Sequence, residues 1–390
     1  MTMSGPISLA EQACALFRAT WRREPASLAS SPGRVNLIGE HTDYNDGFVF
    51  PVAINRRTFV AMGASRDGRS GFVSTSRPDP VLADCPPWRR MEGDCWANYL
   101  AGVAAQFADR GERVPAFCAS VASDLPTGAG LSSSAALEAA TAAALSQLVA
   151  ASFSITELAT LCQKAEHEFA GVRCGIMDQM SSVAGGAIVL DCRTLAFERV
   201  QIPRELSLVI VDSGIPRGLS ATRYNERRGQ CEEGVRLLKT RYPGIEALRD
   251  ITTEMLNIGR KNMSETVFRR CRHVVTENAR VCAAAKAFAE NDFRTVGKLL
   301  HESHVSMRDD YEISLPEIDL LAEIASSAPG CYGARLTGAG FGGAVVSLVD
   351  TCAADAFAEE VVEEYRAKTS KAGTAMRVVP DEGSRKEEPA

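Results

Sequence analysis

The chain has 390 residues, a length that is large for one hydrophobic core and favours two domains with a ligand site in the cleft between them. Hydrophobic residues make up 45% of the sequence and charged residues 24%, and the net charge of -6 argues against nucleic acid as a partner. The sequence has no run of about 18 apolar residues that could span a membrane, so we expect a cytoplasmic protein without a membrane partner.

The N-terminal part of the chain begins with a short amphipathic helix that differs from a secretory signal. A polar segment comes next, RVNLIGEHTDYN, which contains two acids and a histidine. Carboxylates and imidazoles exchange hydrogen bonds with hydroxyl groups, and a site built from them discriminates between sugar epimers. The high density of charged and polar residues in this segment favours a binding site formed by Arg34, Glu40, His41 and Asp43, whereas residues 45–47 are typical of a solvated turn.

Strands are expected over residues 47–63, which are rich in β-branched and aromatic residues. Further along, a glycine- and serine-rich loop precedes an alanine-rich helix expected over 132–151. The unpaired N–H groups and positive dipole at such a helix start suit a polyphosphate, although a serine N-cap on a core helix explains this segment alone equally well. The residues that would contact the phosphates are Gly128, Gly130, Ser132, Ser133 and Ser134.

A second helix is expected over 155–171, and it carries Glu166 near its end. Asp178 follows Gly175 at what reads as a turn. Phosphoryl transfer from ATP needs a cation on the phosphate oxygens and a group that accepts the proton of the attacking hydroxyl. Glu166 and a serine hydroxyl of the loop could hold Mg²⁺, and Asp178 could be the base, although either acid could equally lie at the surface.

Strands are expected at 186–190 and 206–211, and the polar stretch between them predicts a domain boundary. We therefore expect a first domain over 1–198 and a second over 199–380. Helices in the second domain are expected over 221–240, 264–290, 293–308, 316–327 and 352–368, with a strand over 343–349. The charged tail 381–390 is expected to be disordered.

Gly338, Gly340 and Gly343 satisfy the pattern G-x-G-x-x-G. A dinucleotide fingerprint follows a strand and opens a helix, whereas these glycines lead into AVVSLV, which is typical of a strand. We therefore interpret them as a turn at a strand entry whose backbone lies close to a ligand or to the phosphate loop, or which is purely structural.

Taken together, the motifs resemble the galactokinase family of the GHMP kinase superfamily, and the resemblance covers nearly the whole chain. GRVNLIGEHTDYN resembles the signature of that family, and LPTGAGLSSSAA and LTGAGFGG resemble two motifs of the superfamily. The other stretches that resemble the family are CQKAEHEFAGVRCGIMDQ, YNERRGQCEE, RHVVTEN, ESHVSMRDDYEIS and CYGAR.

The resemblance implies an α+β fold with two domains and an active site in the cleft between them. The N-terminal domain would be similar to ribosomal protein S5, with a left-handed βαβ unit, and the C-terminal domain would be ferredoxin-like. The activity implied is ATP-dependent phosphorylation of the anomeric hydroxyl of α-D-galactose, with Mg²⁺ as the cofactor.

The resemblance also implies roles for individual residues. Asp178 would be the base and Arg34 its charged neighbour. The sugar would be bound by Glu40, His41, Asp43, Gly175 and Tyr224. Mg²⁺ would be bound by Ser134 and Glu166, and Trp96 with Asn98 would lie near the adenine.

Two other functions stay open at this point. A kinase for a related sugar, such as N-acetylgalactosamine, galacturonate or arabinose, would share these motifs. A catalytically silent sensor could bind galactose and ATP without turnover, although the complete serine run from Ser132 to Ser134 favours catalysis. The expected oligomeric state is a monomer, with a dimer as the alternative.

Overall fold

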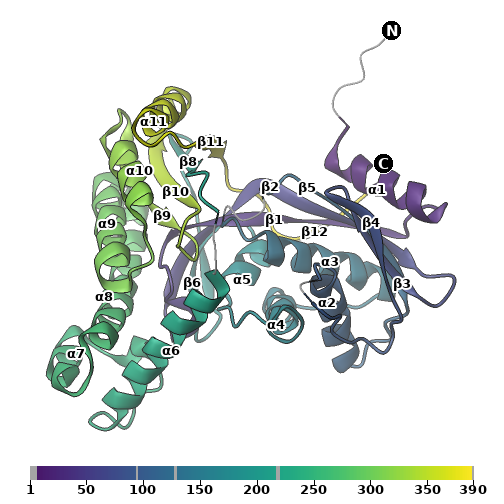
Figure 1. Cartoon of the computed structure of the whole chain (residues 1–390), viewed down its shortest axis with the longest axis horizontal. Helices are drawn as coiled ribbons and strands as arrows, with labels where there is room; N and C mark the ends of the chain where they lie inside the picture. The colour runs from purple at the N-terminus through teal and green to yellow at the C-terminus, as the bar shows by residue number, and fades with distance from the viewer. Residues whose placement is uncertain (1–6, 94, 127–129, 217–219, 389–390) are drawn as a thin grey trace.

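The computed structural model of the chain describes residues 7–93, 95–126, 130–216 and 220–388. Within these residues the strands form two sheets, a larger one of eight strands and a smaller one of four (Figure 1). No described helix combines the length and the apolar character needed to cross a membrane.

The larger sheet has the strand order β12-β1-β2-β5-β3-β4, and β6 pairs with both β2 and β7. Its pairings are antiparallel except for that of β3 with β5. The bounds of its strands are β1 (Ser27–Ile38), β2 (Phe48–Ala64), β3 (Ser70–Ser74), β4 (Arg77–Ala83), β5 (Phe117–Ser123), β6 (Ala187–Asp191), β7 (Phe197–Val200) and β12 (Arg385–Glu387).

Helices cover both faces of this sheet because its strands alternate apolar side chains between the two faces. Ala29 and Val60 face a core shared with α2 (Asn98–Asp109), α3 (Ser133–Val149), α4 (Ile155–Ala165) and α5 (Met177–Ala184). Leu28 and Ala61 face the single helix α1 (Leu9–Trp21), which lies on the opposite side of the sheet in Figure 1. The small alanine side chains of α3 allow it to lie close to β1 and β2.

The smaller sheet is antiparallel and has the order β11-β8-β10-β9, in which the first strand lies between the last and the third, as in a ferredoxin-like sheet. Its strands are β8 (Leu206–Asp212), β9 (Cys331–Thr337), β10 (Ala344–Asp350) and β11 (Thr374–Val378). The helices of this part are α6 (Ser220–Lys239), α7 (Thr253–Gly259), α8 (Glu265–Ala289), α9 (Phe293–Ser306), α10 (Pro316–Ser327) and α11 (Ala354–Thr369).

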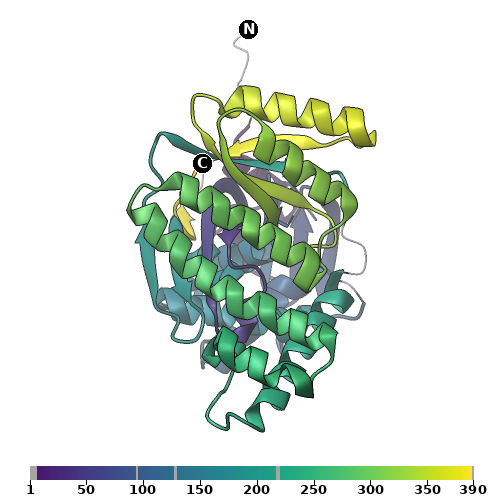
Figure 2. The same ribbon diagram turned by 90° about the vertical axis from the view of Figure 1, so that its left-hand side faces the viewer.

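One face of the smaller sheet packs on its helices and the other packs on the rest of the molecule. Val209 and Val345 belong to the core shared with the helices, whereas Leu208 and Val346 belong to a core that includes β1, β2 and α8. This second core joins the two sheets, and the long helices α8 and α9 run across the molecule beside it (Figure 2).

Short helical turns occupy several connections. Three are 3-10 turns, at Asp43–Asn45, Leu248–Asp250 and Arg260–Asn262. Two are π-helical turns that extend α4 and α9, at Glu166–Ala170 and Met307–Tyr311. Such π turns concentrate at functional sites, and both of these contribute residues to the region described below.

The helices expected from the sequence are present within a few residues of their predicted bounds, and the strands expected at 47–63, 186–190, 206–211 and 343–349 are β2, β6, β8 and β10. The prediction that Asp178 lies in a turn is wrong, because it lies in the first turn of α5. The sequence did not predict β1, β3, β4, β5, β7, β9, β11, α2 or α7.

The prediction of a disordered tail is wrong for residues 381–388. Strand β12 pairs with the edge of β1, and Ser30 donates a hydrogen bond of 2.5 Å to Glu387. Asp381 forms an ion pair of 2.8 Å with buried Arg57. The charges that suggested disorder are therefore used in contacts with the larger sheet.

The expected division of the chain into domains at residue 198 stays a prediction, as does the handedness of the βαβ unit. Residue 198 lies inside β7, which pairs with β6 of the larger sheet. The chain enters the smaller sheet at Leu206 and returns to the larger one at Arg385.

Candidate active site

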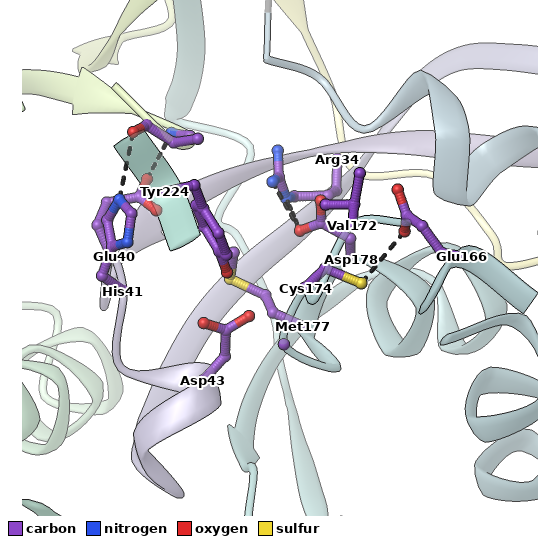
Figure 3. Close-up of a pocket in the computed structure, with 13 residues that line it drawn as sticks. Arg34, Glu40, His41, Asp43, Glu166, Val172, Cys174, Met177, Asp178 and Tyr224 are labelled. Atoms are coloured by element: carbon purple, nitrogen blue, oxygen red, sulfur yellow. Dashed lines mark hydrogen bonds and ion pairs between the residues drawn. The ribbon is translucent and has the colours of Figure 1, made fainter. Parts of the chain in front are cut away.

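A cavity of about 200 Å³ lies where β1 and α5 meet the turn between β9 and β10 (Figure 3). Its wall brings together residues that are far apart in the sequence. The predicted site residues that line it are Arg34, Glu40, His41, Asp43, Glu166, Gly175, Asp178 and Tyr224, and its other lining residues are Val172, Cys174, Met177, Gly338 and Ala339.

Arg34 and Asp178 form an ion pair at this cavity. The Arg34 Nη2 and Nε atoms lie 2.6 and 2.8 Å from Asp178 Oδ1, and Arg34 Nη1 donates a hydrogen bond to the Gly130 carbonyl oxygen at 2.6 Å. The Ser132 hydroxyl donates to Asp178 Oδ2 at 2.6 Å. Ser132 has a φ of 56°, a left-handed conformation that is uncommon for serine. The carboxylate of Asp178 is therefore held by two groups, the Arg34 guanidinium and the Ser132 hydroxyl, and 27% of its side chain stays exposed.

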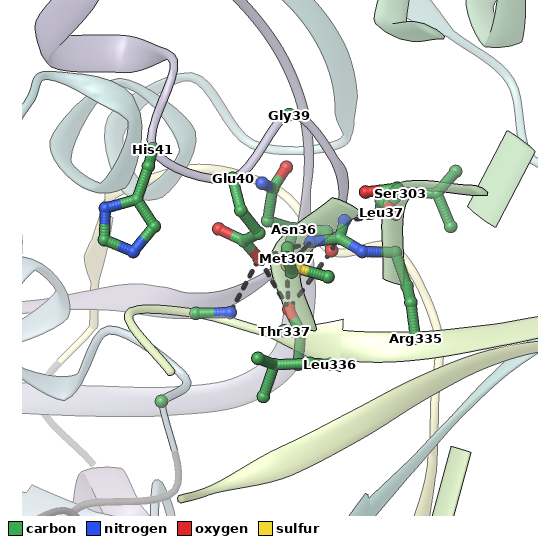
Figure 4. Close-up of polar contacts among 12 residues, drawn as sticks. Asn36, Leu37, Gly39, Glu40, His41, Ser303, Met307, Arg335, Leu336 and Thr337 are labelled. Carbon is green, nitrogen blue, oxygen red and sulfur yellow. Dashed lines mark hydrogen bonds and ion pairs between the residues drawn. The ribbon is translucent and has the colours of Figure 1, made fainter. Parts of the chain in front are cut away.

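Glu40 is held by residues of β9 and of the turn that follows this strand of the smaller sheet (Figure 4). Its Oε1 atom lies 3.0 Å from Arg335 Nη2 and accepts a hydrogen bond of 2.6 Å from Gly338 N–H. Arg335 also donates to the Leu37 carbonyl oxygen at 2.7 Å, and its side chain has no solvent exposure. Because all of these bonds go to Oε1, the carboxylate orientation is fixed without using Oε2.

His41 adopts a left-handed backbone conformation with a φ of 62°. Asn45 supports it by donating a side-chain hydrogen bond of 2.9 Å to the His41 carbonyl oxygen. The ring nitrogens lie 2.7 Å from the Tyr44 hydroxyl oxygen and 3.2 Å from the Ala339 carbonyl oxygen. The Tyr224 ring lies beside the imidazole, with 5.1 Å between the ring centres. Asn45 thus has a structural role that the interpretation as a solvated turn missed.

Asp43 lies against Gly175. A Cβ atom placed on Gly175 would lie 1.9 Å from Asp43 Oδ2, so only glycine allows this approach. Burial raises the pKa of Asp43 to about 7, and the nearby Asp178 carboxylate adds to the effect. Gly175 therefore shapes the cavity through the position of Asp43.

Glu166 lies at the far end of the cavity on the π turn after α4. Its Oε2 atom accepts a hydrogen bond of 2.6 Å from Gln179 Nε2 and one of 3.3 Å from Cys174 Sγ. Burial raises the pKa of Glu166 to about 7, the Asp178 carboxylate raises it further, and a hydrogen bond from Ser134 opposes the shift. No ion pair to Glu166 occurs among the described residues.

A second cavity, of about 810 Å³, adjoins the first at the start of α3. Arg34, Asp178 and Ala339 line both cavities, so the two spaces meet at the Asp178 carboxylate. The second cavity is lined by the predicted phosphate-binding residues Gly130, Ser132, Ser133 and Ser134. Gly128, which was also predicted there, lies outside the described residues.

Trp96 lies in the turn before α2 and lines a third cavity, of about 340 Å³, together with Tyr99, Ser133 and Ser134. This arrangement puts an aromatic ring near the phosphate-loop serines. Asn98 is buried, and its amide group exchanges hydrogen bonds of 2.8 and 3.0 Å with the backbone of Met91. Asn98 therefore holds the turn and is not among the residues that line this cavity.

Known proteins match this chain over most of its length. The galactokinase galactose-binding signature matches residues 15–64, the GHMP kinase N-terminal domain matches 98–186, and the GHMP kinase C-terminal domain matches 284–367. A galactokinase of Roseiflexus sp. (strain RS-1) is 44% identical over 361 residues, which are 92% of each chain. The Homo sapiens galactokinase is 42% identical over 360 residues, 90% of each chain.

The chain belongs to the galactokinase family. It is therefore a sugar kinase with the GHMP kinase fold, as the motifs predicted. The crystal structure of Lactococcus lactis galactokinase complexed with galactose superposes with a TM-score of 0.91 at 34% identity, over 96% of this chain and 98% of that one. The Methanococcus jannaschii mevalonate kinase, with a TM-score of 0.64 at 18% identity, shares the fold.

Several residues of this galactokinase-family site were not predicted from the sequence. Arg335 and Thr337 hold Glu40 from β9, and Gln179 bridges Glu166 to the buried Glu138. The sequence did contain a signal for Arg335, because it is the one charged residue in the apolar run that leads to Gly338. A charged residue inside a strand is buried only with a partner.

Proposed function

We propose that this protein transfers the γ-phosphoryl group of ATP to the anomeric hydroxyl of α-D-galactose and so produces galactose 1-phosphate and ADP. The observation that carries the proposal is the position of Asp178. Its carboxylate lies where the cavity lined by Glu40, His41 and Asp43 meets the cavity lined by Gly130 and the serines 132–134. A hydroxyl bound in the first cavity would face a phosphate bound in the second.

In this reaction Asp178 accepts the proton of the anomeric hydroxyl while the sugar oxygen bonds to the γ-phosphorus and the bond to the ADP oxygen breaks. The Ser132 hydroxyl and the Arg34 guanidinium keep the carboxylate in place. Arg34 also lines the phosphate cavity, so its positive charge stabilises the negative charge on the transferring group.

The sugar itself would be bound by Glu40, His41, Asp43 and Tyr224. Gly175 would contribute because its lack of a side chain lets the Asp43 carboxylate lie against it. Glu40 Oε2 is left as an acceptor because Oε1 carries the bonds to Arg335 and Gly338. Fixed acceptors and donors of this kind distinguish galactose from its epimers, since a mispositioned hydroxyl would leave a buried polar group unpaired.

Mg²⁺ would be held by Ser134 and Glu166 together with the phosphates of ATP. The donor set fits, because a hydroxyl and a carboxylate are hard oxygen ligands and the Glu166 carboxylate is buried without an ion-pair partner among the described residues. No group of three or more histidine, cysteine or acidic residues in the described ranges could hold a metal by itself, so the phosphates would complete the site. When bound there, the ion would supply positive charge that offsets part of the charge of the phosphates.

The nucleotide would lie along the start of α3, with the phosphates at Gly128, Gly130 and the three serines. The aromatic ring of Trp96 would contact the adenine. The cytoplasmic location and the monomeric state stay predictions, and a dimer remains the alternative.

The test is ADP release by the purified protein with Mg²⁺ and ATP, measured in parallel with galactose, N-acetylgalactosamine, galacturonate, arabinose and glucose. Release that depends on galactose supports the proposal. Release with one of the other sugars alone would reassign the substrate. Binding of both galactose and ATP without any turnover would indicate a sensor instead of an enzyme.

A further inference from the structure

Four polar side-chain atoms form a chain of contacts that ends at His41. Cys231 Sγ on α6 lies 3.1 Å from the Tyr311 hydroxyl oxygen, which lies 2.7 Å from the Tyr44 hydroxyl oxygen. The Tyr44 hydroxyl lies 2.7 Å from His41 Nδ1. Tyr311 belongs to the segment ESHVSMRDDYEIS, which the proposed reaction leaves without a role.

The donors along this chain can be assigned from its far end. His41 Nε2 lies 3.2 Å from the Ala339 carbonyl oxygen, and a carbonyl only accepts, so Nε2 carries the proton. In a neutral imidazole Nδ1 is then an acceptor, and the Tyr44 O–H donates to it. Because the one Tyr44 hydroxyl proton is used at His41, Tyr44 accepts from the Tyr311 O–H. The Tyr311 proton is then used as well, so Tyr311 accepts from the Cys231 thiol.

Tyr311 is well placed to orient other groups. It has no solvent exposure, and its carbonyl oxygen accepts a hydrogen bond of 2.7 Å from Arg227. Its ring centre lies 4.9 Å from that of His41 and 4.5 Å from that of His273. The backbone of His41 is left-handed, a conformation that persists only where surrounding contacts hold the residue. The contacts of its ring with Tyr44 and Tyr311 are among those that hold it.

We propose that Tyr311 is a positioning residue for sugar binding, which acts through Tyr44 to orient the His41 ring by a hydrogen bond to its unprotonated Nδ1. This inference rests on the proposed galactokinase reaction. The chain of hydrogen bonds runs from Tyr311, in the π turn after α9, to Tyr44 and His41, so the second part of the protein orients a ring that lines the cavity. Tyr311 touches no reacting group and contributes only through His41.

The kinetic test uses Tyr311→Phe, which removes one hydroxyl and keeps the ring. We expect the KM for galactose to rise about two- to tenfold, the effect of one hydrogen bond, with kcat and the KM for ATP nearly unchanged. Tyr44→Phe should have a similar or larger effect, and the double variant should match Tyr44→Phe because both changes break one chain. Tyr332→Phe is the control, since its hydroxyl donates to Asp350 away from the cavities.

The second measurement is the ¹⁵N spectrum of the histidine side chains without sugar. The chain has five histidines, and the His41 signals are identified as those missing from the spectrum of His41→Gln. We expect a neutral ring with the proton on Nε2 in the wild-type protein. In Tyr44→Phe we expect the Nδ1 signal to shift toward that of an imidazole nitrogen without a hydrogen bond, while Nε2 keeps its proton because the Ala339 carbonyl oxygen remains. A proton on Nδ1 or a charged ring in the wild-type protein would overturn the inference.

The two measurements separate this inference from the proposed function. A wild-type protein without turnover of galactose would contradict the proposed function, while the tautomer would still be measured. A wild-type protein that phosphorylates galactose, together with an unchanged galactose KM in Tyr311→Phe, would contradict the role of Tyr311 alone. Equal changes in the KM values for galactose and ATP would indicate a general structural effect and would also contradict it.

Discussion

The two ends of the active-site cavity are built in different ways. At the phosphate end, Asp178, Arg34 and Ser132 all come from the part of the chain that forms the larger sheet, and their mutual bonds orient the carboxylate. At the sugar end, Glu40 depends on Arg335 and Gly338 from the smaller sheet. In the proposed reaction, the reacting group would thus be positioned by one part of the protein, whereas sugar recognition would require both parts to be docked together.

This difference predicts that changes at the phosphate end affect turnover with little effect on stability. Asp178→Asn keeps an oxygen that can accept from Arg34 and removes the basic carboxylate. We expect kcat to fall about 10²- to 10⁴-fold, the usual contribution of a general base, while ATP still binds. ADP release and ATP titration measure the two effects. The control is Asp67→Asn in an exposed turn, and near-normal turnover by Asp178→Asn would contradict the assignment of the base.

Changes at the sugar end should instead reduce stability as well as sugar binding. Arg335→Met leaves the Glu40 carboxylate and the Leu37 carbonyl group buried without their charged partner. Removal of one member of a buried ion pair costs about 3–5 kcal/mol of unfolding free energy. Urea denaturation measures this loss, and the KM for galactose should rise in the protein that remains folded.

The matched control for that variant is Arg377→Met on β11. Arg377 lies 3.8 Å from Asp355 in a pair that is partly exposed to solvent, and such pairs contribute about 1 kcal/mol or less. An equal loss of stability in the two variants would mean that the docking of the smaller sheet does not depend on the contact between Arg335 and Glu40.

The sequence predicted many of the residues that line the cavities but not the residues that hold them, for a physical reason. Arg34, Glu40, His41 and Asp43 lie in one short polar segment whose composition favours a binding site. The charge of Arg335 within an apolar run indicates that it is buried with a partner, but the sequence does not identify that partner, Glu40, which is distant along the chain. Gln179 likewise contacts Glu138, 41 residues away. The same holds for Tyr311, which lies 267 residues from Tyr44.

Two of the elements that the sequence did not predict, β1 and β12 in the tail, illustrate why patterns in the sequence failed. Strand β1 contains several polar residues, and it also contains Pro32 and Gly33, which are unusual in a strand. A register shift between Pro32 and Arg34 accommodates the proline and the glycine. The tail was interpreted from composition alone, which contains no information about partners such as Ser30, 357 residues away from Glu387.

Glu166, the proposed metal ligand, provides a third test of the comparison. Glu166→Gln removes the charge and keeps the size of the side chain, so we expect the Mg²⁺ concentration for half-maximal activity to rise about tenfold or more. Unfolding free energy should change little, since Glu166 forms no ion pair among the described residues. Glu168→Gln is the control on the same π turn, because that side chain instead accepts a hydrogen bond from Gln106. An unchanged Mg²⁺ titration would exclude Glu166 as a ligand.

The smallest expected effect concerns the charge of Asp43 at the sugar end. Burial first, and then the Asp178 carboxylate, raise the pKa of Asp43 from 3.8 to about 7 in the folded protein. Between these values the unfolded chain is ionised at Asp43 and the folded protein is protonated, so this group lowers the unfolding free energy as the pH rises toward 7. Below the unfolded pKa both states are protonated, and the penalty is absent.

Asp43→Asn removes this titration. Its unfolding free energy relative to the wild-type protein should therefore increase by about 1 kcal/mol between pH 5 and pH 7 and stay level above that, since water in the open cavity limits the effect. Urea denaturation of both proteins at several pH values measures the difference, and the titration of Glu166 cancels because both proteins contain it. A difference that does not depend on pH would mean that Asp43 keeps its charge in the folded state.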